Sequence, residues 1–237
     1  MVRTIFWYIG FWGFMILSVF LTIPLFFLFL PGFKRAREKY INIIVSWWAK
    51  YLLLLAGGKI KVQGLKNIPP HKKICFVANH QGAFDIPIIL GYLPLTPGFI
   101  AKKELLYIPL VNMWMYAIGC IFINRSNRRA SLSAIERGVT QLQSERPMIL
   151  FPEGTRSKCS KMNNFKPGSL KMPIRAKATI VPVTISGSYK MKEARNGLIT
   201  PAHVKLIIHA PVETKGMTEQ QTYPLAASLS STISSVA

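Results

Sequence analysis

Two short polar segments of this chain combine residue types that can move a proton and bind an anion. The first runs from residue 78 to 85, with the letters ANHQGAFD, and places His80 five residues before Asp85, the only aspartate in the chain. A carboxylate that hydrogen-bonds one imidazole nitrogen leaves the other nitrogen free as a base, which is what removing a proton from an alcohol requires. The alternative is a helix-capping pair with no catalytic role.

The spacing of this pair constrains its geometry. Five residues on a regular α-helix correspond to a rotation of about 140°, so His80 and Asp85 would not share a helix face. We therefore expect His80 at or before the first turn of a helix, with Asp85 pointing back towards it from within that helix. The apolar run 74–78 comes directly before the pair and is typical of a strand.

The second segment, residues 151–157 with the letters FPEGTRS, also follows an apolar run. Pro152 and Gly154 favour a turn. Thr155, Ser157 and the backbone N–H groups of such a turn can donate hydrogen bonds, and Arg156 offers a bidentate fork for phosphate. An ordinary polar loop with a surface arginine has the same composition, and the residues alone do not separate the two interpretations.

Both segments need a scaffold that brings strand ends together. Apolar runs alternate with helical spacing after residue 57, which predicts an α/β fold with a mostly parallel or mixed sheet flanked by helices. Active groups in such folds lie at the ends of strands. The predicted helix covers residues 126–144, and the predicted strands are 59–62, 74–78, 99–101, 121–123, 148–151, 180–185 and 204–209.

The N-terminal part has the composition of a membrane anchor. Residues 4–33 carry no charge, and a bilayer needs only about 20 apolar helical residues. The run is too long for a cleavable signal peptide and lacks a small-residue cleavage site. Pro24 should kink the helix, and the four cations between residues 34 and 39 should face the cytoplasm by the positive-inside rule.

A second, shorter apolar stretch at residues 40–57 contains Trp47 and Trp48, and we expect it to lie at the membrane interface. One spanning helix plus a surface helix, or two helices in one leaflet, both fit. We therefore predict membrane-anchoring helices over 1–57 and an α/β domain over 58–237.

The formal net charge of +21 predicts polyanionic partners. Nucleic acid, anionic lipid and phosphorylated substrates all qualify, and each well-placed cation contributes about 1 kcal/mol to the attraction to anionic lipid. A membrane-tethered nucleic-acid-binding protein is a rival, but it would interleave aromatic and basic residues, whereas the aromatics here crowd into the N-terminus. Scattered histidines and few acids predict no metal site, and three unpaired cysteines argue against a disulfide framework.

Several ordered motifs resemble one family. The segment from Asn79 to Asp85 and the 151–157 segment are joined by AKKEL at 101–105, IPL at 108–110, GCIFINR at 119–125, FK-x-G at 165–168 and IVPV at 180–183. This series resembles the 1-acylglycerol-3-phosphate acyltransferase family (the bacterial PlsC type, lysophosphatidic acid acyltransferases) over about residues 62–188. Departures include Gly82, where many relatives have serine.

The resemblance implies a role for each matching residue. His80 would be the general base and Asp85 its orienting partner. Arg125 and Arg156 would bind the phosphate of the acceptor, with Lys102 as a third cation. Glu153, Gly154 and Thr155 would shape the glycerol pocket, and backbone N–H groups near the helix after His80 are our candidates for stabilising the oxyanion.

The implied reaction moves a fatty-acyl group from acyl-ACP or acyl-CoA to the sn-2 hydroxyl of 1-acylglycerol 3-phosphate, which gives phosphatidic acid without a resident cofactor. The expected partners are the lysophospholipid, the acyl thioester and membrane lipids, with acyl carrier protein as a possible donor. The expected location is the membrane, with the catalytic domain on the cytoplasmic side (the inner membrane in a bacterium). Glycerol 3-phosphate, another lysophospholipid, or an aminoacylated or glycolipid acceptor remain alternatives.

Overall fold

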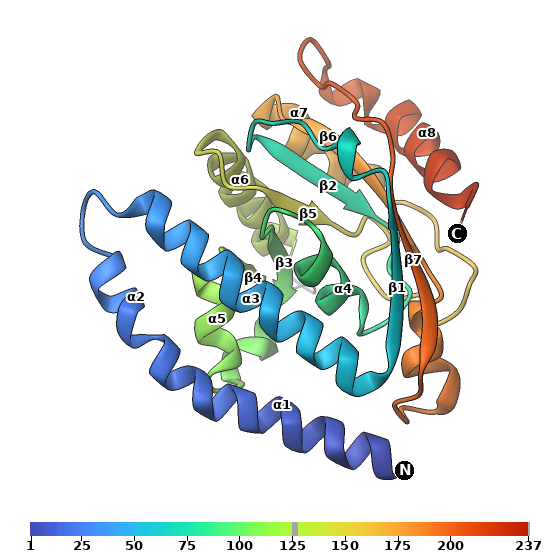
Figure 1. Ribbon diagram of the computed structural model, residues 1–237. Coiled ribbons are helices and arrows are strands. Elements are labelled where there is room, and N and C mark those ends of the chain that lie inside the picture. Colours follow the sequence, from blue (N-terminus) through green and yellow to red (C-terminus); the bar gives the residue numbers. More distant parts are fainter. Residues whose placement is uncertain (125–127, 237) are drawn as a thin grey trace.

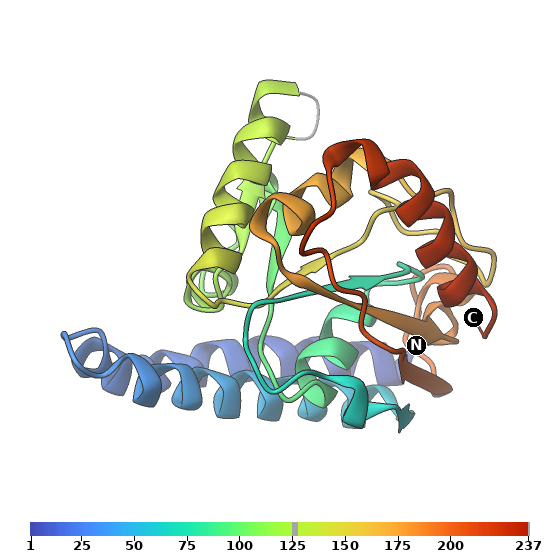
Figure 2. The ribbon, with the colours of Figure 1, turned by 90° about the horizontal axis from the view of Figure 1, so that it is seen from above.

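The computed structural model describes residues 1–124 and 128–236 as three layers, with one seven-stranded sheet between two layers of helices. Helices α1, α3, α4 and α5 cover one face of the sheet, and α6, α7 and α8 cover the other (Figures 1 and 2). This arrangement confirms the predicted α/β fold with a mixed sheet flanked by helices.

The helices and strands have the following bounds. The helices are α1 (Val2–Leu21), α2 (Ile23–Leu28), α3 (Lys34–Ala56), α4 (Asp85–Tyr92), α5 (Val111–Ala117), α6 (Arg128–Gln143), α7 (Lys171–Ala176) and α8 (Thr222–Ser234). The strands are β1 (Gly58–Gln63), β2 (Ile74–Ala78), β3 (Gly98–Lys102), β4 (Ile121–Ile123), β5 (Met148–Leu150), β6 (Thr179–Ser186) and β7 (Ala202–Ile208).

The strand order β1-β7-β6-β2-β5-β3-β4 places β2 between β6 and β5. All neighbouring strands are parallel except β6 and β7. Val77 pairs with Leu150 of β5 and with Pro182 of β6. The carboxyl ends of these three central strands therefore meet at one edge of the sheet, and the segments that follow them lie together.

Strand β2 is buried along its whole length because both of its faces are covered. Phe76 and Ala78 pack in the core under α1, α3 and α4, whereas Cys75 and Val77 pack in the core under α6, α7 and α8. A strand enclosed on both faces has a continuous apolar sequence rather than an alternating one. That explains the uninterrupted apolar sequence of β2.

The N-terminal apolar run forms two helices with the kink expected near Pro24. Helix α1 ends at Leu21, and Pro24 lies in the first turn of α2, where its missing N–H costs little. Helix α1 has the length and apolar composition to cross a membrane. It runs alongside α3 (Figure 1). Its outward side chains, such as Phe6 and Phe20, are largely exposed.

Helix α3 is longer than the interfacial helix expected at residues 40–57, because it already begins at Lys34. Its inner face, including Val45, Ala49 and Leu53, is buried against α4 and the sheet, whereas Trp47 is 67% exposed on the outer face. The helix therefore joins the α/β core on one side and presents apolar groups outwards on the other. The domain boundary at residue 57 stays a prediction.

Candidate active site

The two polar segments singled out in the sequence lie side by side at the carboxyl edge of the sheet. The loop 79–84 connects β2 to α4, and the second segment follows β5. The N–H of Ser157 donates to the carbonyl of His80 at 2.8 Å, and the N–H of Lys158 donates to that of Gln81 at 3.1 Å. These backbone hydrogen bonds fix one loop on the other.

His80 and Asp85 are in direct contact, with 2.7 Å between Nδ1 of the ring and Oδ2 of the carboxylate. His80 precedes α4, and Asp85 is its first residue, so the carboxylate points back as the spacing requires. Because Asp85 accepts the Nδ1–H, the Nε2 of the ring is left as the basic nitrogen. The ring lines a cavity, so that nitrogen is placed where a substrate can reach it.

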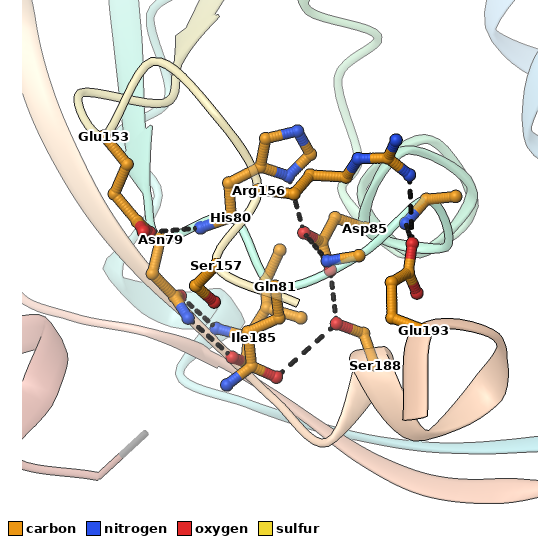
Figure 3. A network of polar contacts seen from close by, with 12 residues as sticks. Asn79, His80, Gln81, Asp85, Glu153, Arg156, Ser157, Ile185, Ser188 and Glu193 are labelled. Atoms are coloured by element: carbon orange, nitrogen blue, oxygen red, sulfur yellow. Dashed lines mark hydrogen bonds and ion pairs between the residues drawn. The ribbon is translucent and has the colours of Figure 1, made fainter. Parts of the chain in front are cut away.

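Asp85 is completely buried, and each of its oxygens has a further donor (Figure 3). The N–H of Gly82 donates to Oδ2 at 2.9 Å, and the hydroxyl of Ser188 donates to Oδ1. A buried carboxylate is costly unless such donors surround it. The donors also hold its orientation, and therefore the orientation of the histidine ring.

The imidazole is held from the other side by the segment after β5. Its ring stacks on Phe151 with 4.1 Å between centroids and 20° between planes. The backbone N–H of His80 donates to Glu153 at 2.6 Å, and the other oxygen of Glu153 accepts the N–H of Asn163 at 2.8 Å. Burial raises the pKa of Glu153, although the hydrogen bonds from these two N–H groups act in the opposite direction. Glu153 thus braces the backbone of both loops.

Two amide side chains fasten the histidine loop to β6. The side chain of Asn79 donates to the carbonyl of Ile185 and accepts its N–H, both at 2.8 Å. Gln81 accepts the N–H of Gly187 at 2.8 Å. Asn79 therefore extends the hydrogen bonding between β2 and β6 beyond the strand end, and His80 is held between two anchored residues.

The cavity beside His80 has a volume of about 790 Å³ and a mainly apolar lining from α1, α3, α4, β3 and α5. Its polar lining residues are His80, Lys102, Glu104, Thr155, Arg156 and Lys158. Ligand cavities of this size commonly combine an apolar wall with a few polar groups that orient the ligand. This cavity therefore suits a ligand that has an apolar chain and carries an anionic group near the imidazole.

The remaining predicted site residues differ in their position relative to the cavity. Arg156 lines the cavity and forms an ion pair with Glu193, at 2.9 Å between Nη1 and Oε1. Lys102 also lines the cavity, but it is 62% exposed and pairs with Glu104 at 3.3 Å. Gly154 makes the expected turn with a φ of +75°, and Arg125 lies outside the described residues.

The backbone N–H groups proposed for the oxyanion are partly occupied. The N–H of Gly82 donates to Asp85, and that of Ala83 donates to Glu193 at 2.8 Å. These two groups therefore already have acceptors, one from Asp85 three residues on and one from Glu193 in a distant part of the sequence. The N–H groups that would stabilise an oxyanion stay a prediction.

The network also contains residues that were not predicted as part of the site, among them Gln81, Ser188 and Glu193. Ser188 and Glu193 belong to the connection between β6 and β7, in short 3₁₀ turns at Ser188–Met191 and Glu193–Arg195. The rule that active groups follow strand ends could have pointed to Ser188, because it comes two residues after β6. Nothing local in the sequence marks Glu193.

Cys120 lines the same cavity, but its thiol is an unsuitable nucleophile. Burial raises the pKa of Cys120 to about 12, against the weaker opposing effects of a backbone hydrogen bond and of Arg146. The thiol is therefore neutral at physiological pH, whereas nucleophilic attack by a cysteine requires a thiolate.

Known proteins are similar to this chain both in sequence and in fold. The family described as "Acyltransferase" matches residues 59–186, which include both loops and all of β6. The chain belongs to the acyltransferase family. Its fold also matches the crystal structure of PlsC, a 1-acyl-sn-glycerophosphate acyltransferase from Thermotoga maritima, with a TM-score of 0.83 and 30% identity over 98% of this chain and 94% of that one.

Curated acyltransferases from distant organisms are similar over shorter shares of their length. The chain is 30% identical over 182 residues to the chloroplastic 1-acyl-sn-glycerol-3-phosphate acyltransferase BAT2 of Brassica napus, covering 76% of this chain and 52% of that protein. It is 39% identical over 137 residues to the Borreliella burgdorferi enzyme of that name, covering 57% and 54%. The chain thus spans about half the length of these relatives.

Ser188→Ala should lower kcat by about 10-fold at unchanged KM, because Asp85 loses a donor and holds the imidazole less firmly. The measurement is steady-state transfer of an acyl group to lysophosphatidate. Ser228→Ala, at an exposed position of α8, is the matched control and should match the wild type. Equal kcat for Ser188→Ala and the control would contradict the role given to this hydroxyl.

Proposed function

We propose that this protein transfers a fatty-acyl group from an acyl thioester to the sn-2 hydroxyl of 1-acylglycerol 3-phosphate, giving phosphatidic acid. The observation that carries the proposal is the His80–Asp85 contact in the wall of a largely apolar cavity that also contains Arg156. The relatives and the structural neighbour are named for an acceptor of this class, which supports the proposal.

The reaction follows from the free Nε2 of His80. This nitrogen removes the proton of the sn-2 hydroxyl while the hydroxyl oxygen attacks the thioester carbonyl. The carbon–sulfur bond then breaks, and the imidazolium returns the proton to the leaving thiolate. A positioned base of this kind contributes about 10²–10⁴-fold in rate, and the thioester supplies the activation, so no resident cofactor is needed.

Different parts of the cavity lining suit the acyl chain and the phosphate of the acceptor. Its apolar wall suits an acyl chain, since each buried methylene contributes about 0.8 kcal/mol. Arg156 and Lys158 lie in the same wall and are suited to the acceptor's phosphate. Lys102 and Arg125 are further candidates for that phosphate, and Gly154 and Thr155 for the contacts to glycerol.

The apolar faces of α1 and α3 support attachment to a membrane, where both the acceptor and the product reside. The cations at the start of α3 favour a catalytic domain on the cytoplasmic side, at the inner membrane in a bacterium. The donor is acyl-ACP or acyl-CoA, and a direct comparison of the two in one assay identifies it. Including glycerol 3-phosphate and other lysophospholipids tests the alternative acceptors.

His80→Ala should lower turnover by at least about 10³-fold, because the base is lost while folding is retained. The assay follows labelled lysophosphatidate to the diacyl product with each acyl donor, and thermal unfolding checks the fold. His203→Ala, at an exposed position of β7, is the matched control. Wild-type turnover by His80→Ala would refute the proposed base.

Val45→Trp should shift the acyl preference towards shorter chains, because Val45 is a buried part of the cavity wall and tryptophan fills part of that volume. The measurement is the ratio of kcat/KM for palmitoyl and decanoyl donors, expected to fall by about 10-fold or more. Ile43→Trp, on the outward face of α3 with 55% exposure, controls for the added bulk. An unchanged ratio would place the acyl chain elsewhere.

A further inference from the structure

Glu193 connects the catalytic loop to the cation proposed to bind phosphate. Its Oε1 accepts the N–H of Ala83 at 2.8 Å and the Nη1–H of Arg156 at 2.9 Å (Figure 3). Its side chain is only 7% exposed, and Oε2 is buried without a partner among the described residues. A buried carboxylate with an unpaired oxygen is costly. The presence of one beside Arg156 therefore suggests a functional role for it.

Gly82 makes room for this carboxylate. A Cβ atom placed on Gly82 would lie 2.6 Å from Oε2 of Glu193 and 3.1 Å from its Cδ. Any side chain at position 82 would therefore push the carboxylate away from Ala83 and Arg156. The absence of a side chain at Gly82 thus leaves the space that the carboxylate of Glu193 occupies.

We propose that Glu193 is a positioning residue that holds the guanidinium of Arg156 at the cavity wall, ready to bind the phosphate of the acceptor. The inference rests on the proposed function, because it assigns that phosphate to Arg156. A guanidinium has five N–H donors, so the contact through Nη1 leaves donors for a bidentate grip on phosphate. The side chain of Arg156 is 41% exposed. Without the ion pair to Glu193, it would have to become ordered when the substrate binds.

The same ion pair could instead compete with the substrate, if Glu193 stood where the phosphate must go. The contacts that anchor the Glu193 carboxylate favour the role of positioning Arg156. The hydrogen bond from Ala83 and the fit against Gly82 make the carboxylate a fixed part of the site rather than a group that leaves it. The two roles predict opposite changes in KM when the charge of Glu193 is removed.

The test is Glu193→Gln in this chain, with lysophosphatidate as the varied substrate at saturating acyl donor. Glutamine retains an oxygen for the N–H of Ala83 and loses the charge that holds Arg156. We expect KM to rise by about 5-fold or more while kcat stays within about 2-fold. Glu219→Gln, which removes an exposed carboxylate paired with Arg175, is the matched control and should leave both parameters unchanged.

Three further variants make the result decisive. Arg156→Ala should raise KM at least as much, and Arg156→Ala combined with Glu193→Gln should raise it no further. Gly82→Ala, which displaces the carboxylate by its methyl group, should also raise KM, and it provides the test if Glu193→Gln does not fold.

Each outcome has a distinct meaning. An unchanged or lowered KM in Glu193→Gln, or additive effects in the double variant, would overturn the positioning role while an effect of Arg156→Ala preserves the phosphate site. If Arg156→Ala leaves KM unchanged, both the assignment of phosphate to Arg156 and the role of Glu193 are wrong.

Discussion

The hydrogen bond between the Asp85 carboxylate and Nδ1 of His80 determines what this site can do, and much of the surrounding structure supports it. Burying a carboxylate completely is unfavourable unless donors replace the lost water. Here the donors come from the ring itself, from Gly82 in the same loop and from Ser188 in the connection after β6. Asp85 also begins α4, where the partial positive charge of the helix end favours an anion. The carboxylate is therefore ordered by three parts of the chain at once.

The His80–Asp85 dyad, the hydrogen-bonded pair of these two side chains, lies at the boundary between two environments. On one side are hydrogen-bonded loops that follow β2, β5 and β6, and on the other is an apolar wall that includes residues of α1 and α3. The helices that carry an apolar outer surface thus also line the cavity beside His80. A reaction between an apolar acyl chain and a charged acceptor requires such a boundary, since neither substrate is entirely polar or apolar.

Much of this arrangement could be predicted from the sequence, because the central strands are continuous apolar runs. The predicted bounds of β2 and β4 agree with the structure, and the other strands differ by one or two residues at their ends. The contact between His80 and Asp85 was expected from their spacing, on the condition that His80 lies at or before the first turn of the helix that contains Asp85. The start of α3 at Lys34 was missed, because the cations of its first turn conceal the apolar face that begins at Ile41.

The partners of the dyad and of Arg156 could not be predicted in the same way. Ser188 and Glu193 lie about 100 residues after the loop that they contact, and their positions depend on the placement of β6 beside β2. The strand order that creates this neighbourhood is a property of the folded sheet and leaves no local pattern. The roles of the loop glycines likewise appear only with their neighbours, as Gly82 and Glu193 illustrate.

The most direct measurement of the central claim is the turnover of Asp85→Asn at saturating concentrations of both substrates. Asparagine has nearly the same shape, but it carries no charge and no longer imposes one tautomer on His80. Turnover should fall by about 10³–10⁴-fold, while the thermal unfolding transition stays cooperative. A folded Asp85→Asn enzyme with wild-type turnover would contradict the account.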